Sequence, residues 1–350
     1  MARMRRRSEG PVRLAIIGLG RSGWDIHAAA LRGRKDFVIT DVVDLKEDRL
    51  EEARREFGCR THTSLRDFLR ENDAEIAVVA TLSCDHARMS IEALRSGLHV
   101  LVEKPMATRW RDVDRMIAAA KENRRLLTVH QNMRLYPDFV HIQQVIRSGV
   151  LGRIFSIKRA EVSFARRNDW QVLRKYGGGL LNNWGVHLVD QVLQIMDSPP
   201  RDVFADVQHV LNPGDADDHN TILIRAESGQ AALIELSNAC AQPLPQWVLM
   251  GTKGTLVADR ENFHLKYYRK ALPRVAPIDS TAVEGRRYGF GEQIPWEEET
   301  VKAAVPVEKN FYDYLYASLR EGEPLFVTAE SARQTMWVLH QARKGTEFRE

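Results

Sequence analysis

The sequence predicts an α/β protein with two domains: an N-terminal doubly wound parallel sheet, and a C-terminal α+β domain with a large, open, mostly antiparallel sheet. The chain has 350 residues, 44% of them hydrophobic, which suits about two packed domains. Up to residue 135, short apolar runs alternate with segments of helical period, as parallel strands with crossover helices require. Later strands are longer and alternate in polarity, which is typical of a sheet covered on one face.

The expected elements follow these two patterns in order. In the first domain, residues 11–135, we expect strands over 13–18, 37–44, 75–81, 99–103 and 126–131. The second domain, residues 136–350, starts with a helix over 138–148 and continues with strands over 154–164, 221–226, 231–238, 247–250 and 255–258. Residues 271–310 are Pro-rich and aperiodic, which predicts a loop. Helices near 311–320 and 331–344 close the chain, and residues 1–10 form a flexible tail.

Composition and charge exclude several partners. Most of the formal net charge of +4 comes from four arginines in the first ten residues, so the body of the chain lacks the cationic face that nucleic acid needs. Since no apolar run approaches the roughly 18 residues of a membrane span, we expect no membrane partner. Cys59, Cys84 and Cys240 are scattered and lack Cys-x-x-Cys spacing, which argues against a disulfide framework or a zinc site and fits a cytoplasmic location.

A glycine motif, Gly18-Leu19-Gly20-Arg21-Ser22-Gly23, lies between the first strand and a helical segment. Gly18 permits a tight turn, Gly20 lets the backbone approach a pyrophosphate, and Gly23 allows close helix packing. Asp44 ends the next strand, where a carboxylate accepts hydrogen bonds from a ribose and repels a 2′-phosphate. We therefore predict NAD rather than NADP, with Arg21 as the residue that would favour NADP. The alternative is a glycine turn that only packs.

A second motif, Glu103-Lys104-Pro105, ends the strand over 99–103. Ligands of open parallel sheets bind beyond the carboxyl ends of the strands, so we expect Lys104 beside the nicotinamide ring. Partial desolvation and the positive charge of the oxidised ring would lower the pKa of the Lys104 ammonium, which could then exchange a proton with a substrate hydroxyl. The alternative is a surface lysine before a turn proline.

A third motif begins with three glycines at 177–179 and continues into a helical segment. Helical spacing places Asn183, His187 and Asp190 on one face. His187 has the side chain for acid or base catalysis at neutral pH, and Asn183 can bind a sugar hydroxyl. The alternative is a solvated helix face.

Together these motifs make the chain resemble the glucose-fructose oxidoreductase and inositol dehydrogenase family, called Gfo/Idh/MocA. The resemblance spans nearly the whole chain and includes the segment Asn-Met-Arg-Leu-Tyr-Pro at 132–137. It implies a Rossmann domain, a second domain whose open sheet mediates homodimer or homotetramer contacts, and Lys104 and His187 flanking the substrate carbon. One departure is Asn183, because the family usually has there an aspartate, which accepts a proton as an amide does not.

The resemblance implies reversible NAD-dependent oxidation of a secondary alcohol to a ketone on a sugar, cyclitol or related polyol. Lys104 would take the hydroxyl proton, with His187 assisting or substituting. The expected substrate contacts are Asn183, Trp170, Arg134 and Tyr136. The expected cofactor contacts are Gly18, Gly20, Arg21, Ser22, Gly23, Asp44, Thr81, Leu82, His86, Glu103 and Lys104.

Arg159, Arg166, Arg167 and Arg174 precede or adjoin the triple glycine. They indicate either an acidic substrate, such as a uronate or nucleotide-linked sugar, or a solvated basic edge. Among competing classes, a zinc alcohol dehydrogenase would need more cysteines, and a short-chain dehydrogenase would need Tyr-x-x-x-Lys, which is absent. An NAD-binding sensor and a glycosidase that oxidises its substrate transiently both remain open.

Overall fold

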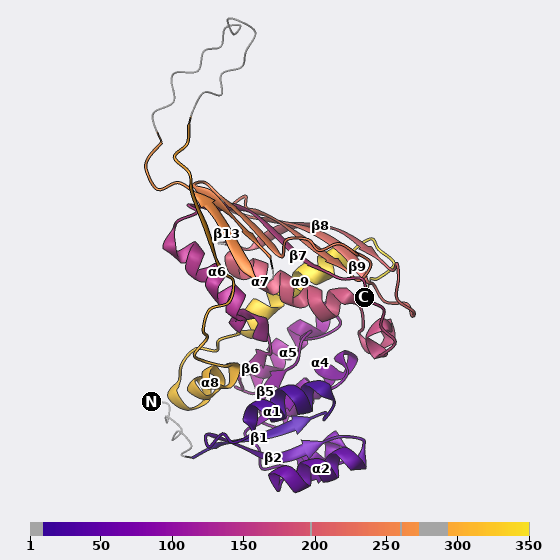
Figure 1. The fold of residues 1–350 in the computed structure, drawn as a ribbon. Coiled ribbons are helices and arrows are strands. Elements are labelled where there is room, and N and C mark those ends of the chain that lie inside the picture. Colours follow the sequence, from indigo (N-terminus) through magenta and orange to yellow (C-terminus); the bar gives the residue numbers. More distant parts are fainter. Residues whose placement is uncertain (1–9, 197, 260, 273–292, 350) are drawn as a thin grey trace, which may run out of the picture.

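The computed structural model describes residues 10–196, 198–259, 261–272 and 293–349. The described part of the N-terminal domain holds a six-stranded parallel sheet in the order β3-β2-β1-β4-β5-β6, seen at the bottom of Figure 1. The order reverses between β1 and β4, so the sheet is doubly wound, as the sequence predicts. Its strands are β1 (Val12–Ile17), β2 (Phe37–Val43), β3 (Arg60–His62), β4 (Ile76–Val79), β5 (His99–Val102) and β6 (Leu127–Val129).

Crossover segments connect these strands and cover the sheet (Figure 1). Every residue of β4 is buried, and β1 is buried except at Arg13, as expected of strands with helices on both faces. The short β3 was not predicted, because Arg-Thr-His is no apolar run. The connecting elements are η1 (Ser22–Ala28), α1 (Ala29–Leu31), α2 (Glu47–Phe57), α3 (Leu65–Glu71), η2 (Ser83–Asp85), α4 (His86–Arg95), α5 (Trp110–Glu122) and η3 (Asn132–Leu135).

The second domain is built on an eight-stranded sheet in the order β14-β13-β12-β11-β7-β10-β9-β8. Neighbouring strands are antiparallel except for the parallel pair β7 and β10, which confirms a mostly antiparallel sheet. Its strands are β7 (Ile154–Val162), β8 (Pro200–Gln208), β9 (His219–Ala226), β10 (Ala231–Ser237), β11 (Trp247–Gly251), β12 (Gly254–Ala258), β13 (Asn262–Tyr267) and β14 (Glu297–Lys302).

Helices cover the face of this sheet that looks toward the first domain, and the ribbon shows none over the opposite face (Figure 1). They are α6 (Pro137–Ser148), α7 (Val186–Ile195) and α9 (Ala329–Arg343). Short helical turns join β7 to α7: η4 (Trp170–Val172), η5 (Arg174–Tyr176) and η6 (Leu181–Gly185).

The structure differs from the sequence-based expectation at β14, β8 and β13. The loop predicted over 271–310 is wrong for 297–302, which forms β14, and its stretch 273–292 lies outside the described residues. This strand reads Glu-Glu-Glu-Thr-Val-Lys and pairs on one side with β13, so backbone hydrogen bonds hold a polar edge strand that hydrophobic periodicity does not reveal. β8 and β13 also escaped prediction. The flexible tail expected over 1–10 lies outside the described residues except for Gly10.

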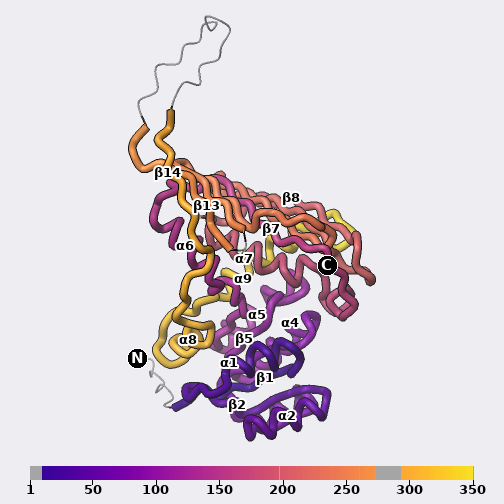
Figure 2. The backbone as a smooth tube through the Cα atoms, viewed as in Figure 1, coloured from indigo at the N-terminus to yellow at the C-terminus, as the bar shows by residue number. Residues whose placement is uncertain are grey.

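The last helices tie the two domains together. The chain runs back from β14 to α8 (Phe311–Tyr316), beside the N-terminal sheet (Figure 2), and continues through η8 (Ala317–Glu321) into α9. Tyr312 is buried with its ring against Phe37 of β2, and the Thr128 hydroxyl of β6 donates to the Val327 carbonyl at 2.7 Å. Residues near the C-terminal end of the chain therefore pack against the first domain and bury part of its surface. Within the described residues no helix combines the length and apolarity needed to cross a bilayer.

Candidate active site

The glycine loop follows β1 at the point where the strand order reverses. Gly18 has φ +94°, and a Cβ there would lie 2.6 Å from the Ala80 carbonyl oxygen. A Cβ on Gly23 would overlap the Gly18 carbonyl, so η1 can pack this closely only without a side chain. A Cβ on Gly20 would meet no atom within 4 Å. The loop therefore leaves open space over the Gly20 backbone, where a pyrophosphate can approach.

Asp44, directly after β2, reaches this loop. Its carboxylate accepts hydrogen bonds from the Leu19 amide at 2.7 Å and the Lys46 amide at 3.0 Å. Arg49 of α2 lies 3.3 Å from the same carboxylate. The geometry fits a ribose-binding acid beside the loop, and it brings next to that acid a cation that sequence reasoning did not single out. Together the open cradle and Asp44 fit a dinucleotide.

A hollow opens between the two domains. The N-terminal domain contributes Ser22, Thr81, Ser83, His86, Glu103, Lys104 and Pro105 to its lining, and the C-terminal domain contributes Trp170, Gln171, Gly177, Gly178, Gly179, Asn182 and Asn183. A second hollow adjoins it and shares Gln171, Gly179 and Asn183. Residues that the sequence predicts from separate motifs therefore meet at one place.

Lys104 bridges the two domains inside this hollow. Its Nζ donates to both the backbone oxygen and the side-chain Oδ1 of Asn183, each at 3.0 Å. Burial lowers the pKa of the Lys104 ammonium; the charge of Glu103 opposes this, and those of Arg21 and Arg167 add to it. In its neutral form the amine can donate both hydrogens to Asn183 and keep its lone pair free for a proton.

His187 lies on α7, one turn beyond Asn183, and is 6% exposed. Burial, and after it the charge of Lys104, holds the pKa of His187 well below its usual range, so the ring is neutral. Its Nδ1 has no hydrogen-bond partner among the described residues. His187 is close enough to feel the charge of Lys104, but it is not among the described residues that line either hollow.

The polar stripe on α7 is not a solvated face. Asp190 is 1% exposed and forms a buried ion pair with Arg134, whose Nη2 and Nε lie 2.6 and 2.7 Å from its two carboxylate oxygens. Arg134 also donates to the Ser331 hydroxyl at 3.0 Å. Its guanidinium, expected to contact substrate, is thus occupied by α7 and α9. Tyr136, also expected there, is 42% exposed and lies outside the lining of both hollows.

The remaining expected cofactor residues take distinct positions. Arg21 precedes η1, and Ser22 and Thr81 line the hollow, with Leu82 following Thr81. His86 is buried, with its Nδ1 2.8 Å from the Pro105 carbonyl and its Nε2 3.2 Å from the Thr81 carbonyl. The Glu103 carboxylate instead hydrogen-bonds to buried histidines.

The four arginines near the triple glycine do not act as a set. Arg159 is 2% exposed, stacks 4.8 Å over the Trp247 ring and lies 3.6 Å from Glu161, so neither expectation, substrate binding or a solvated edge, suits it. Arg167 lines the second hollow and pairs with Asp169 at 2.6 Å. Arg166 and Arg174 are exposed.

Sequence reasoning missed Gln171 and Asn182 of the lining. The Asn182 side chain donates to the Gly177 carbonyl at 3.0 Å and accepts from Arg343 at 2.6 Å, so it fastens the triple-glycine turn to η6 and α9. The position of Asn182 next to Asn183 in the sequence was a signal from which its place in the site could have been predicted. Gln171 lies in the three-residue turn η4, which is too short to show a periodic pattern, and it carried no signal.

A glycine cradle and an acidic strand end at the switch point of a parallel sheet define a dinucleotide-binding protein of the Rossmann class. The model of the oxidoreductase family with an NAD-binding Rossmann fold matches residues 12–131, and that of the GFO/IDH/MocA C-terminal domain matches residues 139–257. The chain belongs to the Gfo/Idh/MocA family of NAD(P)-binding oxidoreductases.

Similar proteins cover nearly the whole chain. Myo-inositol 2-dehydrogenase of Thermotoga maritima is 24% identical over 342 residues, 96% of each chain. An NADP(+)-dependent scyllo-inositol 2-dehydrogenase of Bacillus subtilis is 25% identical, covering 98% of this chain and 96% of its own. Among solved structures, the WlbA dehydrogenase from Bordetella pertussis in complex with NADH and UDP-GlcNAcA has a TM-score of 0.74 at 24% identity, covering 96% of this chain and 98% of its own.

Proposed function

We propose that the chain is an NAD-dependent dehydrogenase that interconverts a secondary alcohol and a ketone on a sugar, cyclitol or related polyol. The observation that carries the proposal is the contact between Lys104, from the N-terminal sheet, and Asn183, from the C-terminal domain, inside a hollow beside the glycine loop. The two inositol dehydrogenases similar to this chain support the substrate class.

In the proposed reaction Lys104 is the base. Burial lowers the pKa of Lys104, which favours the neutral amine, and Asn183 holds the nitrogen so that its lone pair can take the hydroxyl proton of the substrate. Bound NAD supplies the hydride acceptor. His187, whose pKa is lowered and whose Nδ1 has no hydrogen-bond partner in the described part of the chain, assists or substitutes as a proton carrier. Trp170 and Gln171 also line the hollow and would exclude water.

The direct test is replacement of Lys104. We expect Lys104→Ala to lower turnover about 1000-fold while NAD binding changes little, because a general base commonly contributes 10²–10⁴-fold. Lys175→Ala is the matched control: Lys175 is an exposed lysine beside the triple glycine, and its loss should leave turnover unchanged. Wild-type turnover in Lys104→Ala would remove the lysine from the mechanism.

We propose NAD over NADP because the Asp44 carboxylate lies beside the glycine loop and would repel a 2′-phosphate. Arg49 forms an ion pair with Asp44 and would attract a 2′-phosphate if that ion pair broke. The similar enzyme of Bacillus subtilis uses NADP(+). Measured kcat/KM with both cofactors should favour NAD, and Asp44→Asn should narrow the preference. A wild-type preference for NADP would overturn the assignment.

Positive charge around Lys104 supports an acidic substrate as a refinement. Arg21 and Arg167 both act electrostatically on Lys104, and Arg167 lines the adjoining hollow. The WlbA structure holds an acidic nucleotide sugar, UDP-GlcNAcA. A panel of neutral polyols and uronates should show higher kcat/KM for the acids, with the advantage reduced in Arg167→Gln. Equal activity on both sets would contradict the refinement.

A second candidate function is NAD binding without net dehydrogenation, either as a sensor or as a glycosidase with transient oxidation. Asn183 favours it, because the family's usual aspartate at this position would accept a proton and the amide does not. Stoichiometric release of NADH during turnover of a polyol supports the dehydrogenase. Product formation without NADH release supports the glycosidase, and binding without product supports the sensor.

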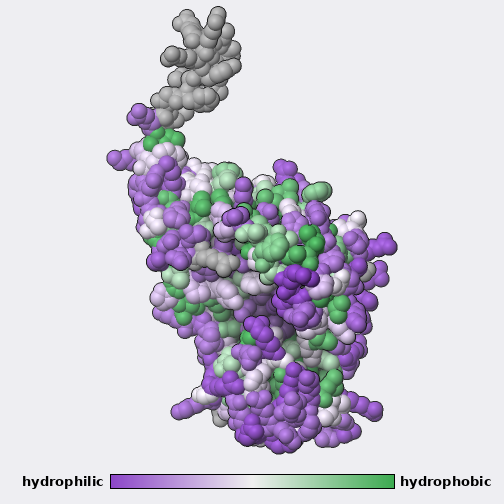
Figure 3. All heavy atoms as spheres, turned by 45° about the vertical axis from the view of Figure 1, so that its right-hand side comes forward, coloured by the Kyte–Doolittle hydropathy of each residue, from purple (hydrophilic) through white to green (hydrophobic). Residues whose placement is uncertain are grey.

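We propose that a second copy of the chain covers the bare face of the large sheet, giving a homodimer or homotetramer. Outward-facing Phe155, Phe204 and Leu223 are 44, 74 and 45% exposed, and Phe204 lies opposite Leu223 in the β8–β9 pair. Figure 3 shows apolar surface in the upper part of the molecule, where this sheet lies. Exposed apolar faces of this kind mark interfaces.

A further inference from the structure

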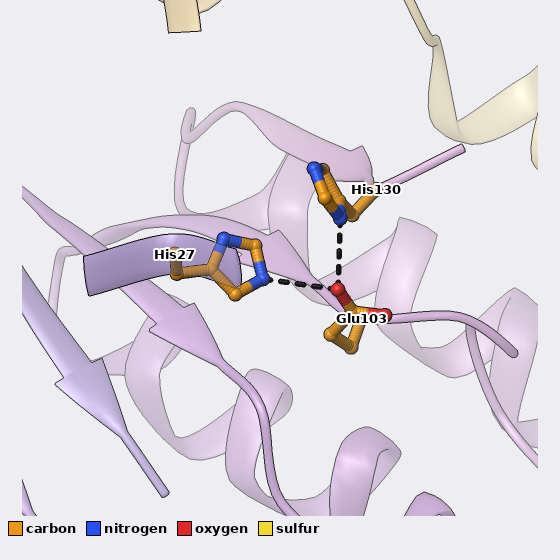
Figure 4. A group of neighbouring side chains, drawn as sticks. All are labelled: His27, Glu103 and His130. Carbon is orange, nitrogen blue, oxygen red and sulfur yellow. Dashed lines mark hydrogen bonds and ion pairs between the residues drawn. The ribbon is translucent and has the colours of Figure 1, made fainter. Parts of the chain in front are cut away.

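A buried cluster of polar side chains includes Glu103, the residue before Lys104; Figure 4 shows three of its members, His27, Glu103 and His130. The Glu103 Oε1 accepts hydrogen bonds from His27 Nε2 at 3.0 Å and from His130 Nδ1 at 2.8 Å. On its other ring nitrogen, His27 Nδ1 lies 2.8 Å from the Tyr312 hydroxyl. The four residues come from η1, the end of β5, the end of β6 and α8, and none is more than 4% exposed.

The three residues His27, Glu103 and His130 are of the types that bind metal ions, and their ligand atoms lie within 4.8 Å of one another. Their distances are nevertheless those of ordinary N–H···O hydrogen bonds. With Tyr312 donating to His27 Nδ1, the neutral His27 ring carries its hydrogen on Nε2 and donates it to Glu103. Each of these atoms thus already has its partner, and we treat the group as a hydrogen-bonded cluster.

The cluster reaches Lys104 through Glu103. The Glu103 Oε2 accepts a hydrogen bond from the backbone amide of Lys104 at 3.0 Å. Lys104 is thereby fixed at both ends, by Glu103 at its backbone and by Asn183 at its Nζ. Burial would raise the pKa of the Glu103 carboxyl, but the charge and hydrogen bonds of His130, and the hydrogen bond of His27, outweigh it and hold that pKa well below its usual range. Glu103 is therefore a buried anion directly behind the proposed base.

We propose that Glu103 is a positioning residue for Lys104: held by His27 and His130, its carboxylate anchors the Lys104 backbone and sets the electrostatic field in which the Lys104 amine gains and loses its proton. Tyr312 extends the cluster to α8 through its contact with His27, so the C-terminal part of the chain helps to hold Glu103 in place. The role of Glu103 in catalysis rests on the proposed function, whereas its effect on the protonation of Lys104 does not depend on that function.

Several charged and titratable groups act on Lys104 besides Glu103. Arg21 in the glycine loop and Arg167 after β7 lower its pKa. His187 on α7 and His86 on α4 are coupled to it electrostatically. Among the groups that shift the pKa of Lys104, Glu103 is the one that raises it. Its loss therefore removes a charge that stabilises the ammonium, so we expect the pKa of Lys104 to fall.

The test measures the reactivity of Lys104 toward acetic anhydride as a function of pH, with mass spectrometry of the peptide that contains it. In Glu103→Gln we expect the pKa of Lys104 to fall by about one unit. At a fixed pH well below the midpoint of the wild-type Lys104 titration, the rate of labelling should therefore rise about tenfold. Glu103→Asp, which keeps the charge, should stay nearer the wild type. His130→Phe, which removes one hydrogen-bond donor from Glu103, should shift labelling in the same direction by less, and serves if Glu103→Gln does not fold.

Asp41→Asn is the matched control. Asp41 is a fully buried carboxylate of the same sheet that accepts from His62 Nε2 at 3.0 Å, so its loss disturbs a similar pair without acting on Lys104. An unchanged Lys104 midpoint in folded Glu103→Gln, or an equal shift in Asp41→Asn, would overturn the proposal. Labelling of Lys104 needs no substrate. A wild-type protein without dehydrogenase activity would therefore refute the proposed function, while the labelling experiment would still test the role of Glu103. In an active enzyme, the acid limb of alcohol oxidation should move to lower pH by the same amount.

Discussion

The two sheets differ in how many of their faces are covered. In the N-terminal sheet, β4 is buried at every position, whereas in the C-terminal sheet β9 alternates between buried residues such as Ile222 and exposed ones such as Leu223. A sheet sealed on both faces can hold a loop and a lysine rigidly at its edge, and a sheet covered on one face leaves the other for a partner. The hollow lies between the carboxyl edge of the first sheet and the segment that joins β7 to α7 in the second domain.

The largest effect is expected in the loop at the edge of the sealed sheet. Gly23→Ala should destabilise the fold by about 3 kcal/mol, since its Cβ would overlap the Gly18 carbonyl. Gly20→Ala should change stability by less than about 0.5 kcal/mol, because its Cβ meets open space, yet it should weaken NAD binding at least about tenfold. Denaturant unfolding and NAD titration separate the two. Equal NAD affinity in Gly20→Ala and wild type would mean that the cofactor does not approach this backbone.

A matched pair of strand residues compares the two sheets directly. Ile16 of β1 is fully buried and Leu223 of β9 is 45% exposed. We expect Ile16→Ala to lower the free energy of unfolding by about 3 kcal/mol and Leu223→Ala by less than about 0.5 kcal/mol, measured at a protein concentration where the chain is monomeric. Similar losses of unfolding free energy in the two variants would show that the outer face of the second sheet is covered within the monomer.

The bare face should matter for assembly. Phe204→Glu places a charge on the most exposed of its aromatic side chains, which an apolar interface does not tolerate. We expect light scattering after size exclusion to show an oligomer for the wild type and a monomer for the variant. As a control, Glu122→Lys changes charge at an exposed site of the first domain and should leave the oligomer intact. A monomeric wild type would contradict the proposed interface.

The smallest expected effect concerns the contact between the two domains. Burial lowers the pKa of Lys104, and Asn183 at 3.0 Å adds no charge to oppose it. Asn183→Asp would place an anion there, which favours the ammonium and should raise the pKa of Lys104 by about one unit. The acid limb of kcat/KM for alcohol oxidation should then move up in pH by the same amount. A profile that does not move would mean that Lys104 does not supply the titrating group.

The sealed sheet was easier to predict from sequence than the open one. Apolar runs such as 76–79 and the glycine spacing are local signals, so the first domain and its cradle follow from them. β14 is held by backbone pairing and has a polar sequence without a periodic signal, whereas β8 places Val203, Ala205 and Val207 at alternate positions, a signal that was available and was missed. The cluster of His27, Glu103 and His130 could not be predicted either, because its members lie far apart in the chain and only the tertiary fold brings them together. The pairing of Arg134 with Asp190 escaped prediction for the same reason.

The most direct measurement is a crystal structure of the protein with NAD and a polyol that it oxidises. We expect the reacting carbon to lie about 3–3.5 Å from the nicotinamide carbon that takes the hydride, with the hydroxyl on that carbon hydrogen-bonded to the Lys104 Nζ. A nicotinamide ring that lies away from Lys104 and Asn183, or a reacting hydroxyl held by other groups, would contradict the account.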